Sequence, residues 1–209
     1  MLSSMKHFRN ALLIAVSILS MTGSHPAMSN PNNDTDEAVL KIEPPAQTKL
    51  APLPFKKHNF AAHCYNTLAC SVIYNSNNFT RPYLDKATSG PRSADYKSDW
   101  GFASTLGVDD FPPPAEVVWR SKNGSAHEAK IDIGAIFKDE LMWHNVPKNE
   151  MADFYEGPVA GEPDIFLEVN DSTINVYMSA YVPTRTEQVP GNKRSTHRND
   201  LYLAWSHVY

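Results

Sequence analysis

A strictly alternating segment near the C-terminus constrains the fold more than any other part of the chain. Apolar side chains recur at every second position from residue 174 to 182, with polar or aromatic ones between them. The apolar set is Ile174, Val176, Met178, Ala180 and Val182. A period of two predicts a strand with one buried face. The residues Asn170, Asp171 and Ser172 before it favour a tight turn, so residues 164–184 are expected to form an antiparallel hairpin.

The same signals recur elsewhere and set the fold class. Asn123-Gly124 divides residues 116–133 into two strand-like runs, and a two-residue turn there would pair Arg120 with His127. Further strands are expected at 59–64, 70–74 and 201–209. Only residues 134–140 suggest a helix, of one or two turns. The chain is therefore expected to be mainly β, an antiparallel sheet or β-sandwich with one or two short helices and long loops.

The first 29 residues have the pattern of a secretory signal peptide. Lys6, His7 and Arg9 precede a short apolar run at 11–21, and small residues follow at 27–29. A membrane anchor is the alternative, but a span needs about 20 apolar residues. We therefore expect residues 1–29 to be removed on export, leaving no integral membrane segment.

Proline interrupts the next part of the chain repeatedly. Residues 30–57 contain Pro31, Pro44, Pro45, Pro52 and Pro54 together with a polar Asn-Asn-Asp stretch. Such a composition favours a flexible linker, since it buries little apolar surface. We expect a single β-rich domain at 58–209, which is long enough to form a substantial core.

Two cysteines, Cys64 and Cys70, are the only ones in the chain. An exported chain meets an oxidising environment, so we expect them to form a disulfide. Free thiols or half of a metal site are the alternatives.

The charge of the chain limits the classes of partner. There are 19 Lys and Arg against 23 Asp and Glu, and the expected signal peptide contains two of the basic residues, which leaves an excess of six acidic side chains. This balance argues against nucleic acid and anionic membrane as partners and suits a basic protein.

No familiar catalytic motif occurs. The chain has no Gly-x-Ser-x-Gly elbow, no His-Glu-x-x-His pair and no phosphate-binding glycine loop. We therefore predict no catalytic residue, metal ligand or cofactor. A hydrolase using His127, Asp132 and His144 remains an alternative. His127 and Glu128 would point to opposite faces of their strand.

Aromatic and acidic residues gather in the expected loops, a combination typical of protein interfaces. The candidate partner-binding residues are Trp100, Asp109, Asp110, Phe111, Asp153, Phe154, Tyr155 and Glu156. Tyr177 and Tyr181, on the polar face of the hairpin, offer a second alternative, a glycan-binding or adhesion surface. They are expected to be covered by a loop or a second sheet.

Several stretches resemble a group of small exported bacterial proteins. They are 60–75 (FAAHCYNTLACSVIYN), 114–120 (PAEVVWR), 132–139 (DIGAIFKD), 167–178 (LEVNDSTINVYM), 186–192 (TEQVPGN) and 200–206 (DLYLAWS). The group resembles periplasmic immunity proteins of type VI secretion lipase effectors, particularly those of the phospholipase D type. The resemblance implies a periplasmic protein without catalysis of its own. Such a protein binds its cognate phospholipase effector and occludes the active site of that enzyme.

Overall fold

The computed structural model describes residues 39–153 and 162–209. The expected signal peptide and the first part of the expected linker, residues 30–38, lie outside the described residues. So do three candidate contact residues, Phe154, Tyr155 and Glu156. Among the helices that are described, none is long and apolar enough to cross a membrane.

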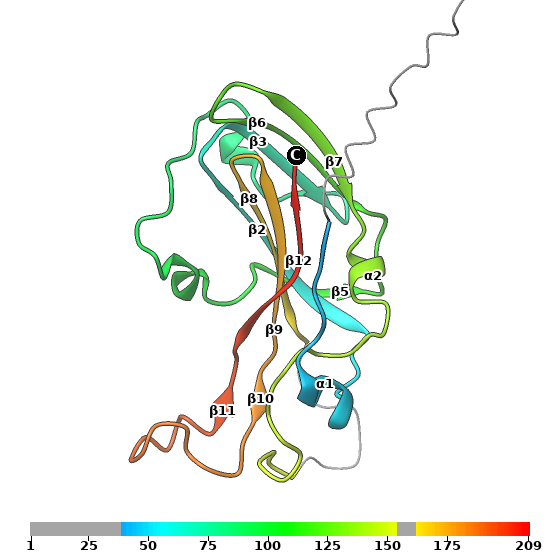
Figure 1. Ribbon diagram of the computed structural model, residues 1–209, viewed down its shortest axis with the longest axis vertical. Coiled ribbons are helices and arrows are strands. Elements are labelled where there is room, and N and C mark those ends of the chain that lie inside the picture. The colour runs from blue at the N-terminus through cyan, green and yellow to red at the C-terminus, as the bar shows by residue number, and fades with distance from the viewer. Residues whose placement is uncertain (1–38, 154–161) are drawn as a thin grey trace, which may run out of the picture. The chain divides into compact units, whose positions relative to one another are not determined.

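Two sheets form the body of the fold and pack in a sandwich-like arrangement (Figure 1). The six-stranded sheet has the order β1 (Leu40–Lys41), β12 (Leu201–Val208), β9 (Thr173–Ser179), β8 (Asp164–Asn170), β2 (Lys57–Tyr65) and β5 (Thr105–Asp109). The four-stranded sheet has the order β4 (Asn77–Asn78), β3 (Thr67–Tyr74), β6 (Ala115–Ser121) and β7 (Ala126–Ile131). A separate pair joins β10 (Val182–Pro183) to β11 (His197–Arg198).

Within residues 39–153 and 162–209, helical structure is confined to four short pieces. They are α1 (Ala46–Leu50), α2 (Ile133–Ile136) and the 3₁₀ turns η1 (Arg81–Tyr83) and η2 (Tyr96–Trp100). Asp132 caps α2, since its carboxylate accepts a hydrogen bond from the Ala135 N–H at 2.9 Å. The predicted class, mainly β with short helices and long loops, is confirmed.

The hairpin predicted at 164–184 is present as β8 and β9. Asn170 pairs with Thr173 across the turn, where Asp171 takes a φ of 54°. The alternating side chains Ile174, Val176 and Met178 are fully buried in the main core. Opposite them, from the four-stranded sheet, come Val117 and Trp119.

One strand pair departs from an all-antiparallel arrangement. β2 runs parallel to β8, with Phe60 opposite Ile165 and His63 opposite Glu168. Parallel neighbours need a long crossover. Here the crossover includes the whole four-stranded sheet, so no local sequence pattern could predict that β2 pairs with β8.

The predicted register of the second hairpin is wrong by one residue. Arg120 pairs with Ala126, and Trp119 with His127. Gly124 has a positive φ of 92°, but Asn123 does not. The Asn123 carboxamide oxygen accepts from the Ser125 N–H at 2.8 Å, and Ser121 N–H donates to the Ser125 carbonyl. The loop is thus three residues long rather than two.

The linker prediction does not hold for residues 39–57. β1 pairs with β12, and Ala51, Leu53 and Phe55 are buried in the main core. These apolar residues alternate with Pro52 and Pro54, so every second side chain faces the core in an extended segment. The prolines need no N–H partner, while the Leu53 carbonyl accepts from Met142 N–H at 2.9 Å.

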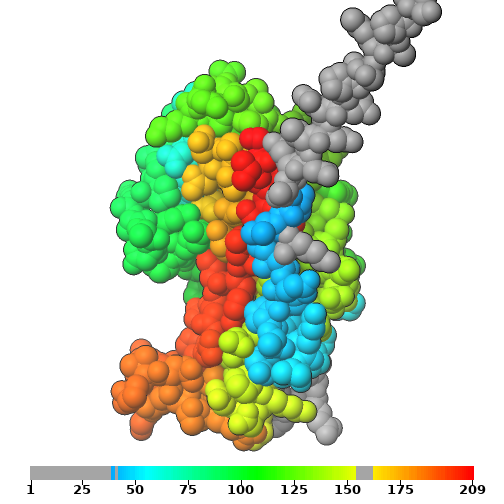
Figure 2. All heavy atoms as spheres, viewed as in Figure 1, coloured from blue at the N-terminus to red at the C-terminus, as the bar shows by residue number. Residues whose placement is uncertain are grey.

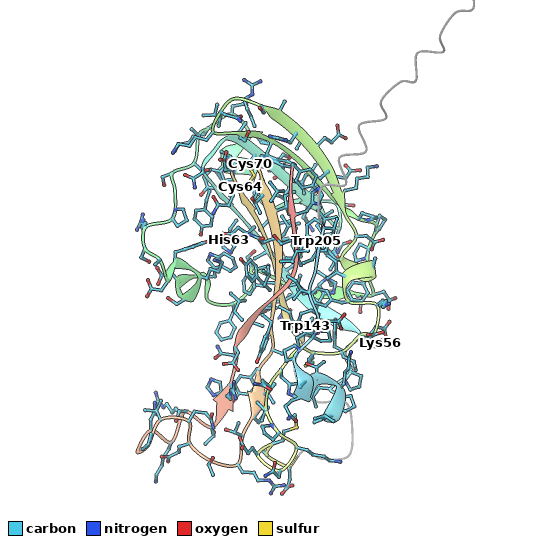
Figure 3. All side chains as sticks on the ribbon, viewed as in Figure 1. Lys56, His63, Cys64, Cys70, Trp143 and Trp205 are labelled. Atoms are coloured by element: carbon cyan, nitrogen blue, oxygen red, sulfur yellow. A yellow bond between two sulfur atoms is a disulfide. The ribbon has the colours of Figure 1, made fainter. Side chains whose placement is uncertain are left out.

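The predicted disulfide joins Cys64 to Cys70. The strands around it were expected to be separated by a five-residue loop, but only Asn66 lies between β2 and β3, with a φ of 55°. Because β2 belongs to one sheet and β3 to the other, the disulfide ties the two sheets together where the chain crosses between them (Figure 3).

Candidate functional site

The predicted contact residues that the structure describes have separate surroundings. Trp100 is half-buried and donates its indole N–H to the Tyr65 hydroxyl at 2.9 Å. Phe111 stacks on His58 at 5.2 Å. Asp153 pairs with Arg185 at 2.5 Å, beyond β10. Asp109 and Asp110 are exposed at the end of β5.

The hydrolase alternative finds no shared site for its three residues. His127 stacks on Trp119 and hydrogen-bonds the Ser121 hydroxyl at 3.0 Å. Asp132 caps α2, and His144 is buried against the Ala51 carbonyl at 2.8 Å. Burial lowers the pKa of His144. Each side chain therefore has separate structural partners.

A long segment, residues 79–104, begins against β3, where the Thr80 hydroxyl donates to the Cys70 carbonyl at 3.1 Å, and ends on the outer face of the six-stranded sheet. We call it the covering segment. It appears in green beside β2 and β8 (Figures 1 and 2). Beneath it lies a second small core made by Ala61, Ala103, Phe166 and Tyr177, with Trp100, Leu201 and Leu203 against it. This explains why β8 is buried on both faces. It also explains why Tyr177 is covered as expected.

A carboxylate lies at the centre of this covered face. Glu168 of β8 is only 1% exposed. It accepts hydrogen bonds from the Tyr96 hydroxyl of the covering segment, from Asn175 Nδ2 at 3.0 Å and from the Tyr177 hydroxyl at 3.3 Å. Burial, and then the contact with Glu168, raises the pKa of Tyr96. Glu168 thus anchors the covering segment to β8 and β9.

His63 of β2 lies across from Glu168 in the parallel register. Its ring stacks under Trp100, with centroids 4.6 Å apart and planes 12° apart. Its Nε2 is buried without a hydrogen-bond partner among the described residues. Burial lowers the pKa of His63, and the nearby Glu168 offsets part of this effect. Figure 3 labels His63 on the side of the sheet that the covering segment occupies.

Just after η2, the covering segment presents the aromatic side chain of Phe102 to solvent. Gly101 has φ 64° and ψ −133°, a backbone conformation that glycine adopts without a Cβ clash. The chain therefore reverses between Trp100, which packs inward, and Phe102, which is 79% exposed. Ala103 is buried again.

Two hollows adjoin Phe102 and share Gly101, Phe102, Ser179 and Asn199 in their walls. The first, of about 480 Å³, is lined by Trp100, Phe166, Leu201 and Lys97 among others. The second, of about 540 Å³, is lined by Leu106, Tyr181, Glu162 and Asp164 among others. Leu106 is 71% exposed and Tyr181 46% exposed. We call Phe102, Leu106, Tyr181 and the two hollows the Phe102 face.

Three carboxylates gather around Lys57 near the end of β5, and one of them, Glu162, also lines the second hollow. Asp109 pairs with Lys57 at 2.6 Å, and this contact raises the pKa of Lys57 above its usual range. Glu162 and Asp110 act on the same ammonium group in the same direction. Three carboxylates against one ammonium make this end of β5 acidic.

The sequence pattern missed the main elements of this site. Two features of the sequence could have indicated the site. Glu168 is the one charged residue in the apolar run 165–169, and Asn175 and Tyr177 share the polar face of the next strand. Phe102 could not be distinguished from Trp100 without the conformation of Gly101. Tyr181 stacks on His197 at 4.4 Å but is not covered, contrary to expectation. The glycan-binding alternative therefore retains one of its two tyrosines.

Among the described residues, no group of three His, Cys, Asp or Glu side chains is arranged to hold a metal ion. The chain matches no protein-family model, no curated protein and no solved structure in these comparisons.

Proposed function

We propose that this chain is an exported inhibitor that binds a toxic lipase effector in the periplasm and blocks access to its active site. The observation that carries the proposal is the Phe102 face. Three exposed apolar side chains, Phe102, Leu106 and Tyr181, surround a common hollow. Exposed aromatic side chains held in one place are the usual anchors of protein interfaces, because they bury a large area at a small cost in entropy.

The support beneath this face favours recognition with little rearrangement. Phe102 is two residues from Trp100, which is fixed by His63 and by the Tyr65 hydroxyl. Leu106 extends from β5 of the six-stranded sheet. An anchor on a preorganised support loses less freedom on binding, so more of its contact energy appears as affinity.

The charge near the face suggests the chemistry of the partner surface. Glu162 lines one of the hollows, Asp109 and Asp110 follow Leu106 at the end of β5, and the chain is acidic overall. A partner with an apolar cavity surrounded by Lys or Arg would complement both features. In this arrangement Phe102 enters the mouth of the lipase active site, and the carboxylates contact its basic border. Trp100, predicted as a direct contact, acts instead as a support.

Replacing Phe102 with alanine is expected to weaken binding to the lipase effector of a neighbouring gene by at least about tenfold, since central aromatic anchors dominate interface energies. The measurement is the dissociation constant of the purified pair, with survival of cells that express the effector in the periplasm as a second readout. Thermal stability should change little, because Phe102 is 79% exposed.

The matched control is Val118→Ala. Val118 is 53% exposed on β6 of the other sheet, so its truncation should leave binding unchanged. If the unmodified protein neither binds the effector nor protects cells, the proposed function is wrong. If it binds but Phe102→Ala binds equally well, the function stands and the docking face lies elsewhere.

A further inference from the structure

The covering segment is attached to the sheet through two neighbouring side chains, an acidic one, Glu168, and a basic one, His63. Tyr96 and Trp100, both on η2, contact Glu168 and His63 respectively. Glu168 and His63 are cross-strand neighbours on β8 and β2. The same short turn therefore covers a buried carboxylate and a half-buried imidazole, and Phe102 lies two residues beyond it.

We infer that His63 and Glu168 form a pH-sensitive latch, which holds the turn Tyr96–Trp100 on the sheet at neutral pH and releases it when His63 gains a proton. The inference rests on the proposed function in one respect only: release of the turn would move Phe102 and so disrupt the Phe102 face that binds the partner. The latch itself is a property of the chain alone.

The geometry explains why protonation opens the latch. A neutral imidazole tolerates its place between Trp100 and the sheet, but an imidazolium needs acceptors for both N–H groups. Nε2 has no acceptor among the described residues, and the covering turn keeps it buried. Moving the turn away would expose the ring to water. Charging His63 therefore favours the open arrangement, although Glu168 reduces the cost of the charge.

The other ionisable groups near His63 come from β2, from β9 and from the covering segment. They are Tyr65, Tyr96 and Tyr177, whose pKa values are raised by burial, Lys97 over the rings of Tyr96 and Tyr177, and the exposed Asp95, Asp99 and Tyr83 near η2. The pKa of Asp95 is lowered by a hydrogen bond with Ser93. Glu168 lies across from His63, and its proximity raises the pKa of His63, against the larger effect of burial. Histidine is the side chain that ordinarily titrates between about pH 5 and pH 8.

The direction of the effect follows from proton linkage. Closure lowers the pKa of His63, so the closed form binds fewer protons than the open form in mild acid. Above about pH 6.5 His63 is neutral in both forms, and the closed form is then favoured most strongly. Below it the opening equilibrium should rise by up to about tenfold per pH unit, until the pH reaches the pKa of the closed form.

Hydrogen exchange measures this opening in the unmodified protein without any partner. The amides of residues 96–103 should show the rise between about pH 6.5 and pH 5.5, after correction for the intrinsic exchange rate. Amides of β6 report global unfolding and should show a smaller change. Equal changes in both regions, or no change at 96–103, would overturn the latch.

His63→Phe keeps an aromatic ring beneath Trp100 and removes the titrating group, so the pH dependence at 96–103 should disappear. The matched control is His127→Phe, since His127 also stacks on a tryptophan, Trp119, at 4.8 Å. It should leave the pH dependence intact. Persistence of the dependence in folded His63→Phe contradicts the inference.

An NMR titration of His63 in the unmodified protein provides a second test if the substituted protein fails to fold. A pKa below about 6.5 supports the latch, and a pKa at or above it overturns the latch. These outcomes are separate from the fate of the proposed function, because none of these measurements involves an effector.

Discussion

Replacing Glu168 with alanine is expected to lower the free energy of unfolding by about 3 kcal/mol, because buried donors that lose their acceptor cost about 1–3 kcal/mol each. Tyr96, Tyr177 and Asn175 all donate to this carboxylate. Asn175 keeps one partner after the substitution, since its Oδ1 accepts from Ser206 Oγ at 2.7 Å, but its Nδ2 donor loses its acceptor. Urea denaturation followed by tryptophan fluorescence measures the change.

Glu116→Ala is the matched control for this substitution. Glu116 is exposed on β6, and its carboxylate is 3.9 Å from the Lys130 ammonium. The expected loss is below about 0.5 kcal/mol, as for most exposed ion pairs. Tyr96→Phe removes a single donor and should cost about 1 kcal/mol. Equal stability of Glu168→Ala and Glu116→Ala would show that the buried cluster does not stabilise the fold.

The parts of the fold that were predictable are those fixed by short-range pattern. Alternation at 174–182 predicted the buried face of β9, because a strand places every second side chain on one side. The turn at Asp171 follows from side chains that stabilise or tolerate left-handed backbone. Neither signal depends on the rest of the chain.

The features that escaped prediction depend on distant residues. Residues 51–55 resemble a linker by composition, and only their contacts with Met142 and the core make them part of the domain. The crossing at Asn66 assigns β2 and β3 to different sheets, and no local pattern separates this from a hairpin. The register at Gly124 moved by one residue because Asn123 used its side chain in the turn.

The sequence predicted which residue types would form a candidate site but not how they are arranged. Aromatic residues in the loops predicted a protein interface, which stays a prediction, and a loop sequence does not say which ring points inward. Trp100 packs on His63 while Phe102 faces solvent, and the conformation of Gly101 between them decides this. His63 and Glu168 meet through the parallel pair β2–β8, which is the least local feature of the fold.

Replacing both Cys64 and Cys70 with serine is expected to lower the free energy of unfolding by about 2 kcal/mol, the chain-entropy value for so short a loop. Reduction of the unmodified protein should lower the denaturation midpoint in the same way. The control is reductant added to the double-serine protein, which should have no effect. An unchanged midpoint after complete reduction would contradict the prediction.

The loss should extend beyond the two sheets, because the same crossing also holds the covering segment. Asn66 N–H donates to the Ser89 carbonyl at 3.1 Å, and Thr88 N–H donates to the Thr67 carbonyl at 2.8 Å. Thr67 and Thr88 also join through their hydroxyls at 2.9 Å. Without the disulfide, Asn66 and Thr67 hold these contacts less firmly, so the Thr88 amide should exchange faster than in the unmodified protein. Amides at the far end of β6, near Ala115, should respond less, since the disulfide pairs with the Trp119 end of that strand.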